Sequence, residues 1–290
     1  MSKQKSAKTH WLGIDLGGTK ILAGVYDQDF KLVGCKKRKT KPELGQEACL
    51  ERLMRTSQEA LQDAKIEKEQ LGGVGIGCPG VLDLESGILV KAPNLGWIDV
   101  PVQKLLEKEF GVPAAVTNDV DAGTFGEYRC GAGKGGSTVF GIFPGTGIGG
   151  ALIYGGKIYR SKTGSCMEIG HLQAIPNGPL CGCGRNGWLE AVAGRLAISA
   201  AASIAVVRGQ APWLQEHAGS DPVNLRSGTL AAAIENGDEV IKKIVVDAFT
   251  CMGEVLGGVV NLLAPDVLVI GGGLAEAMPK LILATLKKSM

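Results

Sequence analysis

Two glycine-rich turns in this sequence have residue types that could bind phosphate groups. The first turn reads Asp15-Leu16-Gly17-Gly18-Thr19-Lys20. Backbone N–H groups of such a turn can point at phosphate oxygens, because glycine has no side chain to block the approach, and Asp15 could hold the Mg²⁺ that accompanies ATP. This is kinase chemistry. The same residues would also suit an ordinary hairpin in which the glycines only supply positive φ.

The second turn reads Gly145-Thr146-Gly147-Ile148-Gly149-Gly150 and formally matches the dinucleotide-binding fingerprint. That fingerprint must be followed by a helix whose N-terminus faces the pyrophosphate. Here a short apolar segment, 151–154, follows and ends at two further glycines, which indicates another strand. We therefore reject an NAD-dependent enzyme and interpret the turn as a second phosphate loop, with a purely structural hairpin as the alternative.

Asn118 and Asp119 directly follow the apolar segment 114–117. Both side chains would emerge at a strand terminus, where α/β proteins place their ligands. Phosphoryl transfer to a hydroxyl needs a group that accepts the proton, and an aspartate within hydrogen-bond reach can do so. The alternative for this pair is an N-cap of a helix over 120–129.

A carboxylate, an imidazole and two thiols follow in the second half of the chain. Glu168 and His171 could converge on neighbouring sugar hydroxyls or on a metal, and Cys181 and Cys183 come soon after them. Together with His171, the two thiols have the ligand types of a structural zinc site, although a closed site takes four ligands and only three are obvious. Two nearby cysteines in a reduced protein could also be small buried hydrophobic residues.

Three consecutive glycines, residues 271–273, follow a strand predicted over 266–270. Gly272 in such a turn would let the backbone pass close to an adenine, or the glycines could simply make a tight turn from strand to helix.

The elements that must position these residues can be predicted from the apolar pattern. Residues 11–37 read as three successive antiparallel strands, and strands then alternate with helices, which indicates an α/β fold. Further strands are predicted over 74–78, 114–117 and 266–270, and helices over 46–66, 102–110, 187–208, 225–235, 239–263 and 275–288.

The first hairpin theme occurs again about half a chain later. Segments 14–26 and 142–154 both read as strand, glycine turn and strand. A duplicated lobe would place the two glycine turns across a common cleft, whereas chance similarity between two hairpins is the alternative. We predict an N-terminal lobe over 1–118 and a C-terminal lobe over 119–290.

Composition excludes several classes of protein. Of the 290 residues, 45% are hydrophobic and 21% are charged, the balance of a globular chain, and the formal net charge of +2 argues against nucleic acid as a partner. No run reaches the ~18 apolar residues that span a bilayer, and residues 1–9 lack the apolar core of a secretion signal. We expect a cytoplasmic protein with reduced cysteines and no membrane role.

Taken in order, these motifs resemble the ROK family of sugar kinases, and the resemblance runs from Gly13 to about Leu286. It implies the two-lobed, duplicated actin-like ATPase (ribonuclease H-like) fold with ATP in the cleft. The two glycine turns look like the family's phosphate motifs. Segments 75–80 and 93–97 resemble its sugar-side loops, which puts Gly80 and Asn94 near the substrate.

The resemblance also implies roles for the polar residues. The family's catalytic pair falls on Asn118 and Asp119, with Asp119 as the base. Its sugar-clamping residues fall on Glu168 and His171, and a further sugar-contacting carboxylate falls on Glu190.

The chain departs from the family's pattern in two places. Members with zinc usually carry a histidine and three cysteines, and Trp188 occupies the third cysteine position here. Either Cys166 or water would then complete a zinc site, or packing alone would hold the loop. The chain also stops at Met290, before the segment that in family members returns a helix to the first lobe, so we expect a truncated product or a different cap.

The predicted function is ATP-dependent phosphorylation of a hexose, with Mg²⁺, and glucose is the favoured substrate. Fructose, mannose or N-acetylmannosamine could replace glucose, and polyphosphate could replace ATP. A non-catalytic sugar sensor is the alternative outside enzymes. A repressor is disfavoured, because only about ten residues precede Trp11 and leave no room for a DNA-binding extension. We expect a homodimer.

Overall fold

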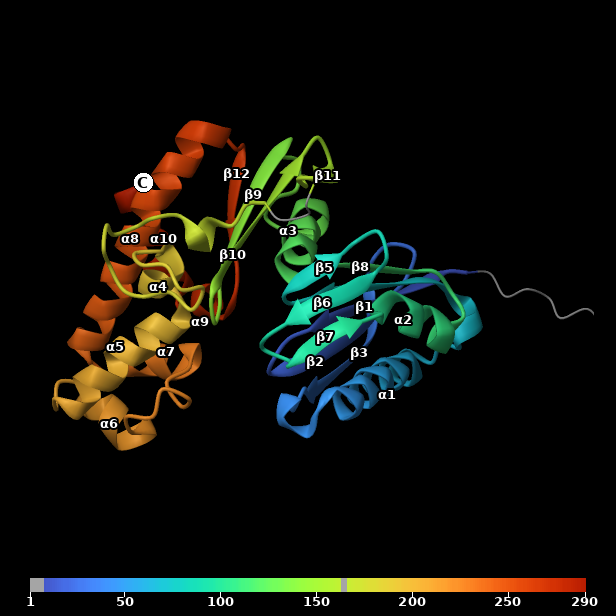
Figure 1. The fold of residues 1–290 in the computed structure, drawn as a ribbon, viewed down its shortest axis with the longest axis horizontal. Helices are drawn as coiled ribbons and strands as arrows, with labels where there is room; N and C mark the ends of the chain where they lie inside the picture. The colour runs from blue at the N-terminus through green and yellow to red at the C-terminus, as the bar shows by residue number, and fades with distance from the viewer. Residues whose placement is uncertain (1–7, 163–165) are drawn as a thin grey trace, which may run out of the picture. The chain divides into compact units, whose positions relative to one another are not determined.

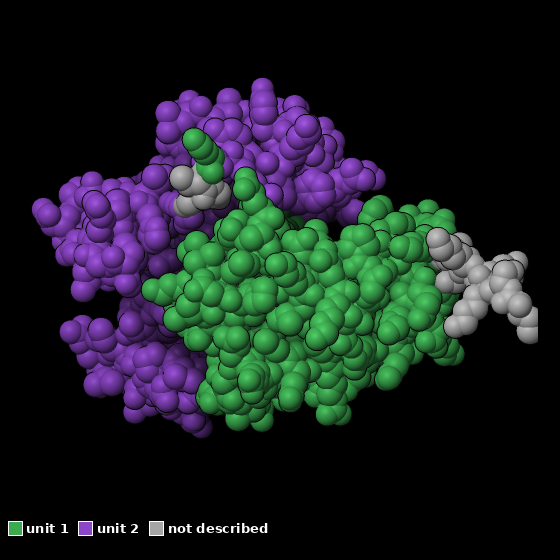
Figure 2. All heavy atoms as spheres, turned by 45° about the vertical axis from the view of Figure 1, so that its right-hand side comes forward, with its two compact units in different colours: residues 1–123, 162–164 green, residues 124–161, 165–290 purple. Residues whose placement is uncertain are grey.

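The computed structural model of this protein describes residues 8–162 and 166–290. The chain divides into two compact units, one of residues 1–123 with 162–164 and the other of residues 124–161 with 165–290 (Figure 2). We refer to them as the first and second unit. The division falls after Gly123, inside helix α3 (Asp119–Cys130), a few residues beyond the boundary that the sequence predicts.

The first unit is built on a five-stranded sheet in the order β3-β2-β1-β4-β8 (Figure 1). The two hairpins β1–β2 and β2–β3 are antiparallel, whereas β4 runs parallel to both β1 and β8. The predicted antiparallel trio is therefore confirmed. The strands are β1 (His10–Leu16), β2 (Lys20–Tyr26), β3 (Leu32–Lys39), β4 (Leu71–Cys78) and β8 (Ala114–Asn118).

Helix α1 (Gln46–Ala64) packs against β2 and β3, and its buried residues line one side only, as the amphipathic pattern predicts. The approach is close at Gly34 of β3, where an added Cβ would lie 2.6 Å from the Cβ of Ala64. Helix α2 (Val102–Phe110) has the predicted bounds and packs against β8.

A second, three-stranded sheet in the first unit was not predicted. It consists of β5 (Val81–Asp83), β6 (Ile88–Ala92) and β7 (Trp97–Val100) in antiparallel order. These strands are too short to show a clear period of two in the sequence. Leu89, Trp97 and Val100 are nevertheless fully buried, so this sheet belongs to the core of the unit.

The sheet of the second unit pairs its strands in the same way as the first. Its order is β11-β10-β9-β12, with an antiparallel hairpin β9–β10 and with β12 parallel to β9, just as β4 is parallel to β1. The predicted duplication is confirmed by this topology. The strands are β9 (Thr138–Pro144), β10 (Ile148–Tyr154), β11 (Lys157–Ile158) and β12 (Val267–Ile270).

Helices cover both faces of this sheet (Figure 1). Phe140, Ile142 and Leu152 face the large helical core, whereas Val139 and Ile153 face Phe125 and Tyr128 of α3, because neighbouring strand residues point to opposite faces. The other helices are α4 (Leu189–Ala193), α5 (Arg195–Val207), α6 (Pro212–Ala218), α7 (Ser227–Glu235), α8 (Glu239–Leu263), α9 (Gly273–Ala277) and α10 (Pro279–Ser289).

Two helical stretches, Leu189–Val207 and α8, are long and apolar enough to cross a membrane by length and composition alone. In α8, Ile241, Phe249, Met252 and Leu256 are fully buried in the core of the second unit. Packing within the unit therefore explains part of its apolar character, while Leu262 stays exposed.

Two predicted helices are each broken into two. The helix predicted over 187–208 is interrupted at Gly194, which has extended backbone angles between α4 and α5. The last helix is interrupted at Met278, because the following Pro279 disfavours helical geometry in the residue before it. The predicted helices over 225–235 and 239–263 correspond to α7 and α8.

Candidate functional site

The first glycine turn joins β1 to β2 and is closed by a hydrogen bond of 2.9 Å from the Gly17 N–H to the Lys20 carbonyl. An added Cβ on Gly18 would lie 3.2 Å from the Cβ of Asn94 and 3.3 Å from its carbonyl oxygen. Only a residue without a side chain fits comfortably there. Gly18 therefore lies beside Asn94, and the phosphate-binding role of the turn and the sugar-side role of Asn94 stay predictions.

Thr40 stabilises this turn by two hydrogen bonds, and sequence reasoning missed this residue. Its hydroxyl donates a hydrogen bond of 2.6 Å to the Gly17 carbonyl, and its N–H donates one of 3.0 Å to the Thr19 carbonyl. The residue is fully buried. The thiol of Cys49 on α1 in turn donates to the Thr40 and Lys41 carbonyls, at 3.5 and 3.3 Å. No local pattern marks Thr40, because its partners lie about twenty residues away.

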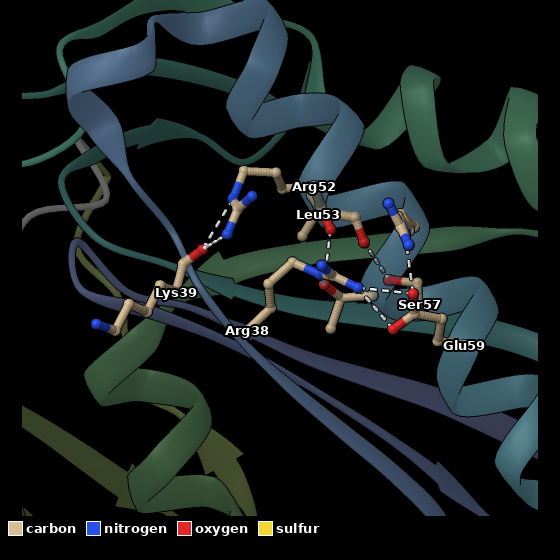
Figure 3. Close-up of polar contacts among 8 residues, drawn as sticks. Arg38, Lys39, Arg52, Leu53, Ser57 and Glu59 are labelled. Carbon is tan, nitrogen blue, oxygen red and sulfur yellow. Dashed lines mark hydrogen bonds and ion pairs between the residues drawn. The ribbon is translucent and has the colours of Figure 1, made fainter.

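Helix α1 fixes the end of β3, from which Thr40 follows (Figure 3). Arg52 donates to the Lys39 carbonyl through Nε at 2.9 Å and Nη2 at 2.7 Å. About two turns further along the helix, Glu59 accepts from Arg38 Nη2 at 2.6 Å. The strand end is thus attached to the helix on both sides of Lys39, and this attachment keeps Thr40 under the glycine turn.

Asn118 and Asp119 mark the junction between β8 and α3. Asn118 Oδ1 accepts hydrogen bonds from the N–H groups of Val120 and Asp121 at 2.9 and 3.3 Å, so this side chain caps the helix. Asp119 is the first residue of α3, and its Oδ1 accepts from the Val120 N–H at 3.0 Å. Asn118 therefore takes the alternative role as a helix cap, and Oδ2 of Asp119 accepts none of these three bonds.

Three parallel strand ends lie side by side beneath Asp119. Asp15 of β1 is in register with Gly77 of β4, and Gly77 is in register with Thr117 of β8. Gly77 makes this close packing feasible, because an added Cβ would lie 3.3 Å from the Cα of Asp119. The order β1-β4-β8 thereby places both acidic residues, Asp15 and Asp119, at the carboxyl ends of the parallel strands.

This arrangement changes the ionisation of both carboxyl groups. Burial raises the pKa of Asp119 to about 6, the N–H of Val120 opposes the shift, and the charge of Asp15 adds to it. The pKa of Asp15 is also raised, because neighbouring atoms displace water from its carboxylate, although the residue as a whole is exposed. The positive charge of Lys20 opposes this rise. Asp119 is thus a carboxylate whose proton affinity is high for its type.

The unpredicted three-stranded sheet positions Gly80 and Asn94, the two residues that the resemblance puts near the sugar. Gly80 comes just before β5 with φ of +98°, and an added Cβ there would lie 2.2 Å from the Lys91 carbonyl of β6. Any other residue would be strained at this position. Asn94 lies exposed in the loop between β6 and β7.

In the second unit, the glycine turn between β9 and β10 is closed by a bond of 2.8 Å from the Gly145 N–H to the Gly147 carbonyl. Glu190 of α4 supports it, since Glu190 Oε2 accepts from the Ile148 N–H at 2.9 Å. An added Cβ on Gly147 would meet the same carboxylate at 2.1 Å. The structure thus gives Glu190 an anchoring contact with the turn; its predicted contact with a sugar stays a prediction.

Glu168 and His171 lie on a short 3-10 turn, Ile169–His171, for which Glu168 is the N-cap. Residues three apart in a 3-10 turn project on the same side, so the spacing allows both side chains to meet one ligand. The turn packs on the start of β10, where an added Cβ on Gly170 would lie 2.3 Å from the Ile148 carbonyl. Ile148 thus links this turn to the Gly145–Gly147 hairpin.

His171, Cys181 and Cys183 place one nitrogen and two sulfur atoms within 4.8 Å of one another. The Trp188 indole N–H donates to Cys183 Sγ at 3.2 Å, and the Cys181 thiol donates to Glu190 Oε1 at 3.7 Å. Cys166 is outside this group, and its thiol donates to the Tyr159 carbonyl at 3.3 Å. Imidazole and thiolates are the ligands that zinc prefers, and the three atoms fit such an ion with one position left for water.

Gly272 lies in the turn between β12 and α9 with φ of +85°. An added Cβ would lie 2.9 Å from the Pro144 carbonyl, at the end of β9. The glycine triplet is therefore next to the second glycine turn, and the role of Gly272 beside an adenine stays a prediction.

A model of the ROK family matches residues 11–290 of this chain. The chain belongs to the ROK family. It is 34% identical over 274 residues to a glucokinase of Thermotoga maritima, with 93% of this chain and 84% of that protein covered. It is also 30% identical over 210 residues to the DNA-binding transcriptional repressor Mlc of Escherichia coli, with 72% of this chain and 50% of the repressor covered.

The solved structures agree with this ROK assignment. A ROK family glucokinase from Streptomyces griseus, in complex with glucose and AMPPNP, matches with a TM-score of 0.84 and 30% identity over 97% of this chain and 88% of that one. A ROK hexokinase from Thermus thermophilus matches with a TM-score of 0.75 and 32% identity, again over 97% and 88%. The predicted family and its actin-like ATPase fold are confirmed.

The role of Thr40 is testable by stability. We expect Thr40→Val to lower the free energy of unfolding by about 1–3 kcal/mol, because the isosteric change removes the buried bond to the Gly17 carbonyl. Amide protons of the turn, residues 17–20, should also exchange faster. Denaturant unfolding and hydrogen exchange measure both effects.

Thr285→Val is the matched control, since the Thr285 hydroxyl donates to Leu281 within its own helix. It should cost less than about 0.5 kcal/mol. Equal losses for the two variants, or unchanged exchange at residues 17–20, would contradict a role of Thr40 in holding the turn.

Proposed function

We propose that this ROK protein is an ATP-dependent hexose kinase that phosphorylates the primary hydroxyl of glucose, with Asp119 as the general base. One observation carries the proposal. Asp119 stands where a strand ends and a helix begins, beside Asp15 and the first glycine turn, and its pKa is raised to about 6. A base is most effective when its pKa lies near the working pH, since it is then ionised and still binds a proton well.

The reaction assigns a task to each part of the first unit. Asp119 accepts the proton of the sugar hydroxyl as the oxygen attacks the γ-phosphorus of ATP, ADP leaves, and the carboxylic acid then returns its proton to water. Asn118 orients Asp119 through the helix cap, and Gly80 and Asn94 belong to the loops on the sugar side. The N–H groups of Gly17, Gly18, Thr19 and Lys20 meet phosphate oxygens, with Asp15 holding the Mg²⁺.

The second unit supplies the remaining contacts in this proposal. Gly145, Thr146 and Gly147 form a second phosphate loop, and Gly272 lets the backbone approach the adenosine. Glu168, His171 and Glu190 contact sugar hydroxyls. The support is the identity of about a third with the Thermotoga maritima glucokinase and the likeness to the glucose- and AMPPNP-bound Streptomyces griseus enzyme.

Glucose is favoured over fructose, mannose and N-acetylmannosamine because these relatives are named glucokinases. The second candidate is a sugar-responsive regulator without catalysis, which the 30% identity with the repressor Mlc favours. Asp119 favours the kinase, because its raised pKa suits a general base. We further propose that the protein acts in the cytoplasm, as a homodimer, without nucleic acid or membrane as a partner.

The kinase proposal is tested with Asp119→Asn and a panel of hexoses. ADP release by the natural protein should be fastest with glucose, and the variant should lose about 10²–10⁴-fold in kcat, because the amide cannot accept the proton. A coupled ADP assay measures turnover, and calorimetry with glucose checks that the variant still binds sugar. Near-normal turnover in Asp119→Asn would remove the proposed base, and no ADP release with any hexose would favour the regulator.

The same variant gives a stability readout. Because the folded pKa of Asp119 is above the unfolded value, its contribution is favourable below about pH 4 and is lost as the pH rises through about 6. At pH 8 the free energy of unfolding of Asp119→Asn should therefore exceed that of the natural protein by about 1–2 kcal/mol. Denaturant unfolding of both proteins measures this difference. A less stable variant at pH 8 would mean that the natural carboxylate is not desolvated.

We also propose that His171, Cys181 and Cys183 hold a structural zinc ion whose fourth ligand is water. Protein prepared with zinc in the medium should contain about one equivalent per chain. Cys181→Ser should abolish it, whereas Cys166→Ser should retain it, since the Cys166 thiol bonds elsewhere. Metal analysis measures this content. Natural protein without zinc, or loss of zinc in Cys166→Ser, would overturn the assignment.

A further inference from the structure

Two arginines of the second unit approach the second glycine turn from different helices. Arg195 begins α5, and Arg226 is the residue before α7. The Arg195 N–H donates to the Gly145 carbonyl and its Nη2 donates to the Thr146 hydroxyl, both at 2.9 Å. Arg195 is thus attached to the turn by both its backbone and its side chain.

Arg226 lies on a segment that packs beside the glycine triplet, and its Nε donates to the Val223 carbonyl at 3.2 Å. The residue next to it, Ser227, has its hydroxyl 3.4 Å from where a Cβ on Gly273 would lie. The neighbouring Gly272 packs on the Pro144 carbonyl, just before the turn. Three segments from distant parts of the sequence, the starts of α5 and α7 and the β12–α9 turn, therefore meet around residues 144–146.

The charges of the two arginines are not neutralised by acidic side chains. Among the residues that the structure describes, no carboxylate forms an ion pair with Arg195 or Arg226. Burial and the charge of Arg226 both lower the pKa of Arg195, so the two guanidinium groups act on each other. Like charges held together without a counter-charge are unfavourable, and an anion bound beside them would remove the cost.

We propose that Arg195 and Arg226 form the part of the donor site that binds a phosphoanhydride chain on the second unit. This inference rests on the proposed kinase function and names the residues that recognise the donor. In the described part of the chain, the Arg195 side chain donates one hydrogen bond, to the Thr146 hydroxyl, which leaves most of its five N–H donors for ligand oxygens. Guanidinium groups bind phosphate through paired N–H donors, which gives direction as well as charge.

In this proposal Arg195 and Arg226 bind the phosphate groups of the donor and make no contact with the adenine base. Adenosine lacks the anionic chain, so its affinity should not depend on either arginine, whereas ADP and inorganic tripolyphosphate share the chain. The chemistry is the same whether the donor is a nucleotide or a polyphosphate, and the two sources are separated by the ligands used in the test.

The test is calorimetry on the full chain with ADP, tripolyphosphate and adenosine as three separate probes. Arg195→Gln and Arg226→Gln should each weaken ADP and tripolyphosphate about tenfold and leave adenosine unchanged. Arg208→Gln is the matched control, because Arg208 is an exposed arginine at the other end of α5. It should bind all three ligands as the natural protein does.

Several results decide the matter. Unchanged ADP affinity in both variants, an equal loss for adenosine, or no binding of ADP by the natural protein would overturn the inference. If ADP binds through the arginines while no hexose is phosphorylated, the inference stands and the kinase proposal fails. Arg226 is exposed, so Arg226→Gln keeps the test valid even if Arg195→Gln does not fold.

Discussion

The chemistry of this protein depends on a carboxylate that is held out of water beside another carboxylate. Asp15 lies at the carboxyl end of β1 and Asp119 directly follows β8, with the parallel strand β4 between them, and burial is the largest cause of the raised pKa of Asp119. An ionised acid in such a place is costly to the fold, because it lacks the water that would stabilise its charge. The cost gives the side chain a higher affinity for a proton than an exposed aspartate has, which is the property a general base needs.

The rest of the first unit keeps that pair in place. Hydrogen bonds run from α1 through Arg52 and Cys49 to the end of β3, and from Thr40 to the glycine turn that follows Asp15. Gly18 and Gly77 allow the backbone to approach Asn94 and Asp119 without side chains between them. Both turns are thus supported from outside, the first by Thr40 and the second by Glu190, although the supporting residues come from unrelated positions.

The sequence predicts much of this fold because its signals are local. Alternating apolar residues and paired glycines mark the two hairpins, and the helical period marks α1, α2 and α8 to within a few residues. The two glycine turns and Asp119 can be found in the same way, since each follows an apolar strand. The three short strands β5 to β7 could not, because strands of three to five residues carry little periodicity. The break at Met278 could have been found, since Pro279 marks it in the sequence.

Contacts between distant segments were also beyond the sequence. Thr40 and Arg195 carry no motif, and only the packed structure shows that they contact the glycine turns. The same holds for Cys166, which the sequence offers as a fourth zinc ligand and the structure places on the Tyr159 carbonyl.

The most direct measurement of the central claim is a ¹³C NMR titration of the aspartate carboxyl groups, with the Asp119 resonance assigned by its absence in Asp119→Asn. The account predicts a midpoint near pH 6 in the protein without ligands. A midpoint at or below about 4, the value of an ordinary exposed aspartate, would contradict it.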